Sequence, residues 1–343
     1  MVEPRRLRRS TSTLLLAMLA SMTIAPASAQ DSSPEAGGGA SAAIGNDSDT
    51  PRTVDEEVIV RGQRLSEIEF DLRLYIRNFV NEVAAPARSR GYARWQRNVC
   101  IGVYNLQRTI SQYIVDRISS LALNLGLEPG EPGCEAQVQI IFSTDGKQTA
   151  SLMVKEAPRA FRPIGGYAGM DLGLEALDTF VESDNPVRWW HVSLPVDART
   201  GATAVRIPGF DAPWIAVSGP SRLHSGVRDD LKHIMIVVDT TKLTGTTWQQ
   251  IADYLAFVSL AQVDPNTDPS EFDTILNLFT NPAAYSGLTD WDESYLDALY
   301  SFNQERAASL QRNEIVNDIA ARELGEDDDK GRRRGNRSSS SDR

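Results

Sequence analysis

Apolar residues recur at helical spacing in several stretches of the middle of the chain. Between residues 66 and 83 they recur every three or four positions, which predicts a helix that ends before Pro86. The same spacing over 110–125, followed by Gly126, predicts a second helix. A shorter helix is expected over 152–161, ahead of a glycine-rich loop.

Short apolar runs between these helices are typical of β-strands. They occupy 98–104, 136–142, 188–194 and 234–239. The intervening stretch 195–233 contains four prolines and is interpreted as an elaborated loop with room for hairpin pieces. Because strands and helices are interspersed, the sequence predicts an α+β fold, a mixed β-sheet packed with helices. The order of the strands in the sheet does not follow from the sequence.

The C-terminal third carries two helix-start signals. Thr247 with Gln250 forms a capping box ahead of an apolar helix face that ends near Asp264. Thr289 with Asp292 predicts the start of a later helix in the same way.

The first 29 residues have the pattern of a secretory signal peptide. Four arginines precede a short apolar core, and the segment closes with an A-x-A site that predicts cleavage after Ala29. The alternative, an uncleaved membrane anchor, is disfavoured because the apolar core is too short to span a bilayer. Cleavage removes a segment with a net charge of +3, so the formal charge changes from −11 for the full chain to about −14 for the mature chain. We expect a periplasmic or secreted protein with no transmembrane segment after cleavage.

Two further segments lack hydrophobic periodicity. Residues 30–55 are rich in Ala, Gly, Ser, Asp and Pro and predict a disordered linker. Residues 325–343 combine an acidic run with a basic cluster and four serines, which predicts a disordered mixed-charge tail. A single domain over 56–324 remains.

The composition argues against one class of partner. Acidic residues outnumber basic ones, whereas binding to the phosphates of a nucleic acid needs a basic face, so no nucleic-acid partner is expected.

The chain has two cysteines, Cys100 and Cys134. In an oxidising compartment they are expected to form a disulfide; two buried free thiols are the alternative.

Familiar catalytic motifs are missing from the sequence. The three histidines, His191, His224 and His233, do not have the i, i+4 spacing of a helical zinc site. No nucleophile elbow or phosphate-binding glycine loop is found either, so no catalytic, cofactor-binding or metal-binding residue and no cofactor is assigned. Trp189, Trp190 and Trp214 suit an aromatic ligand platform, although alternation between the core and a half-buried face is the favoured interpretation.

The C-terminal third resembles that of zincin-type metallopeptidases of the metzincin kind, and of exported bacterial proteins that keep this frame. In those enzymes an H-E-x-x-H-x-x-G-x-x-H helix is followed by a tight turn and then by a helix with a Leu-Thr/Ser-x-x-Asp start and a Leu-Tyr end. The turn is similar to 274–277, and the last helix to 288–292 with Leu299 and Tyr300.

The zinc-binding histidines of this helix motif are missing from the chain when the motif is aligned with residues 252–262. The alignment puts Ala252 and Ala256 at the first two histidine positions, Asp253 at the general base and Gln262 at the third ligand, with Ser259 at the glycine. Alanine has no lone pair for zinc, so the resemblance implies a degenerate zincin-like scaffold.

A second resemblance lies at 56–63. This acidic and β-branched segment looks like one near the mature N-terminus of many TonB-dependent outer-membrane receptors, where a strand adds to the edge of TonB. A first strand that pairs with the protein's own sheet is the favoured alternative.

These observations lead to one main expectation and two alternatives. The leading one is an uncharacterised exported protein, a non-catalytic binding protein or pseudoenzyme with an unknown protein or envelope partner. The first alternative is an envelope hydrolase with a divergent active site, which uses carboxylates or a metal site that includes His191 or His233, brought together at a sheet edge. The second is a TonB-linked accessory protein.

Overall fold

The computed structural model describes residues 54–86, 90–163, 172–203, 205, 215 and 226–325. The predicted signal peptide, nearly all of the predicted linker and the predicted tail beyond Gly325 lie outside these residues, as do Trp214 and His224. The predicted domain limits at 56 and 324 therefore stay predictions.

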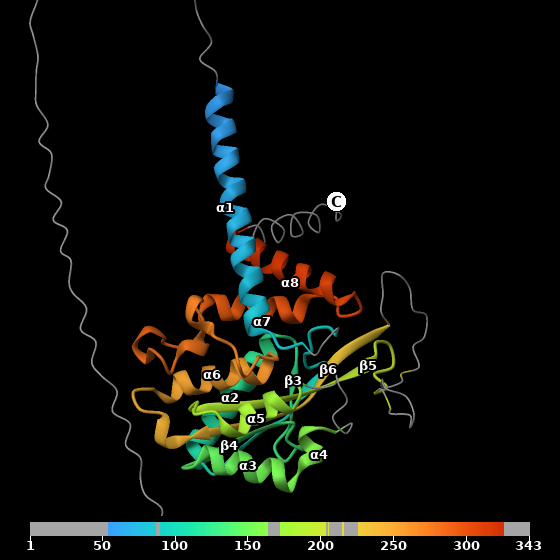
Figure 1. Ribbon diagram of the computed structural model, residues 1–343, viewed down its shortest axis with the longest axis vertical. Coiled ribbons are helices and arrows are strands. Elements are labelled where there is room, and N and C mark those ends of the chain that lie inside the picture. The colour runs from blue at the N-terminus through green and yellow to red at the C-terminus, as the bar shows by residue number, and fades with distance from the viewer. Residues whose placement is uncertain are drawn as a thin grey trace, which may run out of the picture. The chain divides into compact units, whose positions relative to one another are not determined.

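A four-stranded mixed sheet forms the centre of the fold (Figure 1). Its order is β2 (Ile101–Tyr104), β4 (Val138–Ser143), β6 (Val227–Asp239) and β5 (Val187–Asp197). The first three strands are parallel, and β5 pairs antiparallel with β6 at one edge. A separate parallel pair joins β1 (Asn98–Val99) to β3 (Glu128–Pro129). The predicted α+β class and mixed sheet are confirmed.

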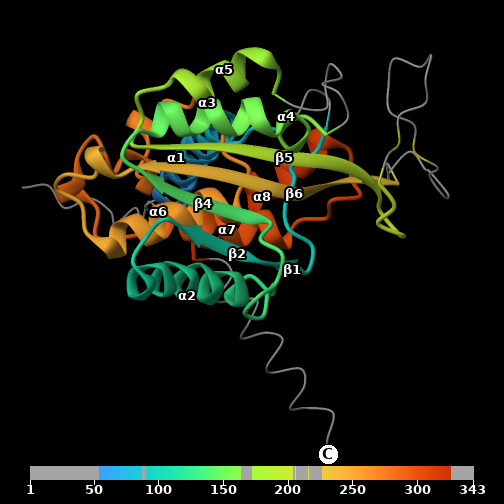
Figure 2. The ribbon, with the colours of Figure 1, turned by 90° about the horizontal axis from the view of Figure 1, so that it is seen from below.

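Helices cover both faces of this sheet (Figure 2). One face carries α3 (Gly146–Glu156), α4 (Pro158–Phe161) and α5 (Leu174–Glu182). The other carries α1 (Val54–Val83), α2 (Arg108–Asn124), α6 (Trp248–Leu260), α7 (Asp290–Ser301) and α8 (Ala308–Glu323). Short 3₁₀ turns are η1 (Thr240–Lys242), η2 (Pro269–Glu271), η3 (Ile275–Asn277) and η4 (Pro282–Ala284).

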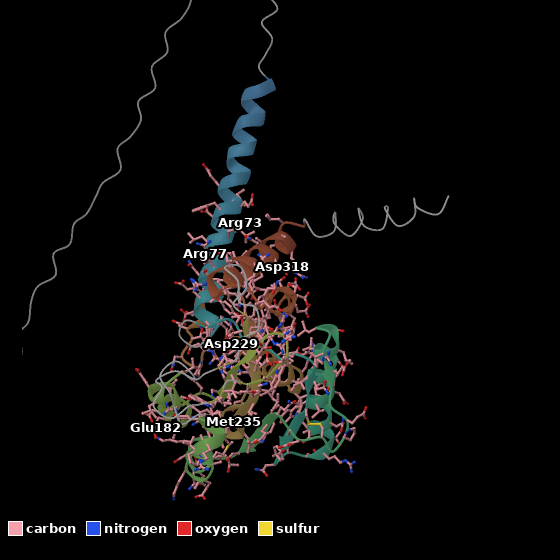
Figure 3. The ribbon with its side chains drawn as sticks, turned by 90° about the vertical axis from the view of Figure 1, so that its right-hand side faces the viewer. Arg73, Arg77, Glu182, Asp229, Met235 and Asp318 are labelled. Carbon is pink, nitrogen blue, oxygen red and sulfur yellow. A yellow bond between two sulfur atoms is a disulfide. The ribbon has the colours of Figure 1, made fainter. Side chains whose placement is uncertain are left out.

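Alternation along the strands divides the core into two clusters. Val138, Ile140 and Phe142 of β4 all join the larger cluster, on the side of α2 and α6. Met235 and Val237 of β6 face the smaller cluster under α3 and α5. Figure 3 shows Arg73 of α1 above Asp229, whereas Glu182 of α5 lies lower, beside Met235.

The neighbouring tryptophans of β5 belong to these clusters. Trp189 faces the larger one and donates from Nε1 to the Val263 carbonyl at 2.9 Å. Trp190 faces the smaller one and donates to the Phe161 carbonyl, also at 2.9 Å. Both are buried, so they are core residues.

Several sequence-based expectations need correction. Residues 56–63 are not a first strand, because they lie within α1. The stretch 195–233 is not all loop, since β5 continues to Asp197 and β6 begins at Val227. Two amphipathic helices, α5 and α8, were not predicted at all.

The predicted disulfide is present. Cys100 and Cys134 are bonded, with their Cα atoms 6.1 Å apart, and tie the start of β2 to the segment before β4. Within the part of the chain that the structure describes, no helix is long and apolar enough to cross a bilayer.

Candidate functional site

Helix α6 begins at the predicted capping box. Thr247 Oγ1 accepts from the Gln250 backbone N–H at 3.2 Å, and the Gln250 side chain accepts from the Thr247 N–H at 2.6 Å. Every residue from Gln250 to Leu260 is buried. The helix therefore packs on all sides, as a central element of the core.

The two positions where the metzincin resemblance expects histidines are closed. Ala252 and Ala256 are both 0% exposed and belong to the larger apolar cluster. Ser259 and Gln262 are buried as well. Alanine offers zinc no ligand atom, and no group of three or more His, Cys, Asp or Glu side chains among the described residues is arranged to hold a metal ion. These residues do not fit a catalytic zinc.

Asp253, at the position of the general base, has an internal partner. Its Oδ1 forms an ion pair with Arg117 Nε of α2. Its Oδ2 accepts from the Leu288 backbone N–H at 3.3 Å and lies where a Cβ on Gly287 would clash with it. The carboxylate therefore joins α6 to α2 and to the chain before α7.

The histidines of the alternative hydrolase do not come together. In the β5–β6 ladder His191 pairs with Ile234, while His233 pairs with Val192. Because neighbouring strand residues point to opposite faces, His191 and His233 lie on opposite sides of the sheet. His191 is buried and its Nε2 lies 2.8 Å from the Val258 carbonyl of α6, whereas His233 is exposed.

Burial also changes the acid–base behaviour of His191. Loss of water lowers its pKa to about 4, against the raising effect of hydrogen bonds to the Val258 and Ala261 backbone. The imidazole is neutral at physiological pH and its ring nitrogen is engaged with the end of α6. It acts as a packing residue that links β5 to α6.

A cavity of about 620 Å³ lies elsewhere, where β6 extends past β4. Only residues 234–239 of β6 pair with β4, so 227–233 run on beyond the parallel strands. The segment before β1 approaches this extension, with the Leu231 N–H donating to the Arg94 carbonyl at 3.0 Å. The lining residues are Trp95, Gln96, Arg97, Asn98, Gln137, Arg199, Thr200, Gly201, Arg228, Asp230, Leu231 and Lys232.

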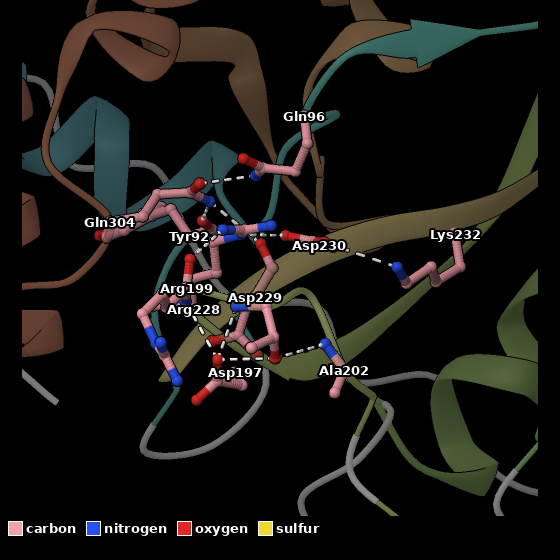
Figure 4. Close-up of polar contacts among 12 residues, drawn as sticks. Tyr92, Gln96, Asp197, Arg199, Ala202, Arg228, Asp229, Asp230, Lys232 and Gln304 are labelled. Atoms are coloured by element: carbon pink, nitrogen blue, oxygen red, sulfur yellow. Dashed lines mark hydrogen bonds and ion pairs between the residues drawn. The ribbon is translucent and has the colours of Figure 1, made fainter. Parts of the chain in front are cut away.

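The polar side chains of β6 meet in this cavity (Figure 4). Asp230 is buried and accepts from Arg228 Nε at 2.9 Å, while Lys232 Nζ lies 3.5 Å from its other oxygen. The Arg228 guanidinium also donates to the Ala198 carbonyl, which joins β6 to the chain after β5. A row of charged groups, in which Arg228 is held by two partners, therefore forms one wall.

A tight turn after β5 forms a second wall. Asp197 Oδ1 accepts from the Thr200 N–H and hydroxyl, each at 2.7 Å, and Gly201 has a positive φ of 72°. This turn presents Arg199 and Thr200 to the cavity.

Buried amides brace the cavity from behind. Gln304 donates from Nε2 to the Tyr92 and Asp229 carbonyls at 3.1 and 3.0 Å, and its Oε1 accepts from Gln96 at 2.7 Å. Asp229 points away from the cavity to Arg90 and to the Gly91 N–H. The backbone around Gln96 and β6 is thereby held by several independent contacts.

The sequence does not predict this site. Its residues come from four separate segments, and the sequence predicts a loop where β6 runs from Val227 to His233. The period-two spacing of Arg228, Asp230 and Lys232 is the signal in the sequence, since it predicts three charged side chains on one strand face.

No protein-family model, no curated protein and no solved structure matches the chain.

Proposed function

We propose that this chain is an exported, non-catalytic binding protein built on a degenerate zincin-like scaffold, acting in a bacterial periplasm or cell envelope. The observation that carries the proposal is the closed face of α6. Ala252 and Ala256 are fully buried, and Asp253 is paired with Arg117. A metallopeptidase needs three ligands and an open metal position at this face.

The order of elements around α6 supports the scaffold part of the proposal. After α6 the chain makes the 3₁₀ turn η3 and then begins α7 with a capping box at Thr289 and Asp292. The buried Asp292 carboxylate accepts from Thr274 Oγ1 at 2.6 Å and from the Ile275 N–H at 2.8 Å. It thus connects the turn to the following helix, as the zincin-like scaffold requires.

Export is supported by the Cys100–Cys134 disulfide, since disulfides persist in oxidising compartments. The signal-peptide pattern in the first 29 residues points the same way.

The binding part of the proposal rests on the cavity beside β6. Its volume of about 620 Å³ falls in the range of small-molecule sites, and its polar groups are held by hydrogen bonds and ion pairs. The hydrolase and TonB alternatives are not supported in this way, since the histidines lie on opposite sheet faces and residues 56–63 are helical.

A cleavage assay tests the non-catalytic claim. The purified protein is incubated with unfolded protein and peptide mixtures in the presence of added zinc, and the products are followed by mass spectrometry. We expect no more cleavage than with an Asp253→Asn variant. Cleavage that a chelator abolishes and that Asp253→Asn lacks would contradict the proposal.

A further inference from the structure

The cavity beside β6 has the opposite charge from the protein as a whole. Four cations and one carboxylate line it, a formal charge of +3, whereas the full chain carries −11. Counting Asp197 behind the turn still leaves an excess of two positive charges. A positively charged recess in an acidic surface concentrates anions at that place.

The cations differ in how firmly they are held. Arg228 is fixed by Asp230 and by the Ala198 carbonyl, and its side chain is 21% exposed. Lys232 has only the longer contact to Asp230 and is 32% exposed. Arg97 is exposed at the rim. One cation is therefore preorganised, and two more are able to turn toward a ligand without giving up a strong internal partner.

Guanidinium groups match the geometry of a phosphate group. Three of the four cations are arginines, whose planar forks bind phosphate oxygens in pairs. An excess of two to three positive charges is better balanced by a phosphate dianion than by a single carboxylate.

Neutral hydrogen-bonding groups stand next to these cations. The Gln137 Oε1 accepts from the Cys100 N–H at 3.1 Å, which leaves its amide N–H groups directed to other partners. Asn98 and Thr200 add two further polar side chains to the lining. Amides and hydroxyls of this kind recognise ligand hydroxyl groups, whereas the cavity offers few apolar contacts.

From this geometry we infer that the cavity beside β6 binds a small phosphorylated, hydroxylated molecule of the sugar-phosphate class, with Arg97, Arg228 and Lys232 contacting the phosphate. The inference deepens the proposed binding function and rests on it. Two different experiments test the two proposals. Zinc-dependent cleavage would overturn the non-catalytic function, whereas the titration with sugar phosphate tests only the ligand of the cavity.

Isothermal titration calorimetry provides the test. The purified protein is titrated with glucose 6-phosphate, inorganic phosphate, glucuronate and glucose. We expect glucose 6-phosphate to bind at least about tenfold more tightly than glucose or glucuronate, and inorganic phosphate to compete with it. Absence of glucose 6-phosphate binding, or glucose or glucuronate binding as tight as that of glucose 6-phosphate, overturns the inference.

Matched variants locate the site. Arg97→Gln and Lys232→Gln are expected to weaken glucose 6-phosphate binding about tenfold each, because each removes a cation from the lining. Arg77→Gln on α1 and Lys155→Gln on α3 remove an exposed cation outside the cavity and are expected to leave affinity unchanged. Thermal melting confirms that the variants fold. Equal affinities for the cavity variants and their controls overturn the assignment of the site.

Discussion

Asp253 of α6 pairs with Arg117 of α2 across the larger core cluster. The Asp253 side chain is 1% exposed and the Arg117 side chain 36% exposed, so a buried carboxylate is balanced by a cation that reaches solvent. The hydrogen bond that Arg117 donates to the Asp253 carboxylate raises the pKa of Arg117. The residue at the general-base position of the metzincin alignment is thus a structural contact between two helices.

Removing this contact is expected to cost stability. Asp253→Asn breaks the ion pair while preserving shape, and should lower the free energy of unfolding by about 1–3 kcal/mol. Urea denaturation measures the change. The control is Asp178→Asn, which alters an exposed carboxylate of α5 and should have little effect. Equal stability of the two variants would contradict a structural role for Asp253.

The burial of His191 predicts a pH dependence of stability. His191 has a pKa of about 4 in the folded protein, against about 6.5 in an unfolded chain. Between these values His191 binds more protons in the unfolded state, so its contribution to stability rises with pH across this window and is level above it. The contribution of His191 amounts to roughly 3 kcal/mol, fully present above pH 6.5 and lost as the pH falls to 4.

Denaturation curves between these two pH values check this expectation. In His191→Asn the part of the pH dependence that His191 supplies should disappear. His233→Asn, which changes an exposed histidine on the other sheet face, should keep most of it. A wild-type profile retained by His191→Asn would show that another group titrates.

The disulfide predicts a redox effect on stability. Cys100 and Cys134 close a loop with a sequence separation of 34, which stabilises the fold by about 3–4 kcal/mol on the chain-entropy model. Reduction, or a Cys100→Ser/Cys134→Ser variant, should lower the melting temperature accordingly. Alkylation of two thiols in the protein without reductant would show instead that the bond does not form.

The packing of α6 predicts that histidines are not tolerated there. Ala252→His/Ala256→His places two imidazoles at positions that are 0% exposed and should destabilise the protein by about 2–5 kcal/mol, with or without added zinc. Ala160→His, at an exposed position of α4, is the control. Stabilisation of the double variant by zinc would show that an open metal cleft survives.

Local signals in the sequence predicted much of the fold. The capping boxes at Thr247 and Thr289 were found because each depends on residues three positions apart. The helix over 110–125 and the strand over 136–142 appear close to their expected limits, since each has a clear apolar period. The disulfide follows from the cysteine count together with the expected export to an oxidising compartment.

The sequence does not predict features that depend on contacts between residues far apart in the chain. The order of the sheet, in which β6 lies between β4 and β5, does not follow from any local sequence pattern. The segment 56–63 has β-branched residues but is helical, so its context overrides its strand propensity. The cavity beside β6 depends on Arg97 and Arg199 meeting a strand about 30 or more residues away in the chain, and only the folded structure shows that.

The proposed function requires the face of α6 to pack within the core and to hold no catalytic metal. Elemental analysis for zinc after folding in zinc-supplemented medium is the decisive measurement. With Ala252 and Ala256 buried in the core, the purified protein should hold far less than one zinc per chain. One tightly held equivalent of zinc per chain would contradict the account.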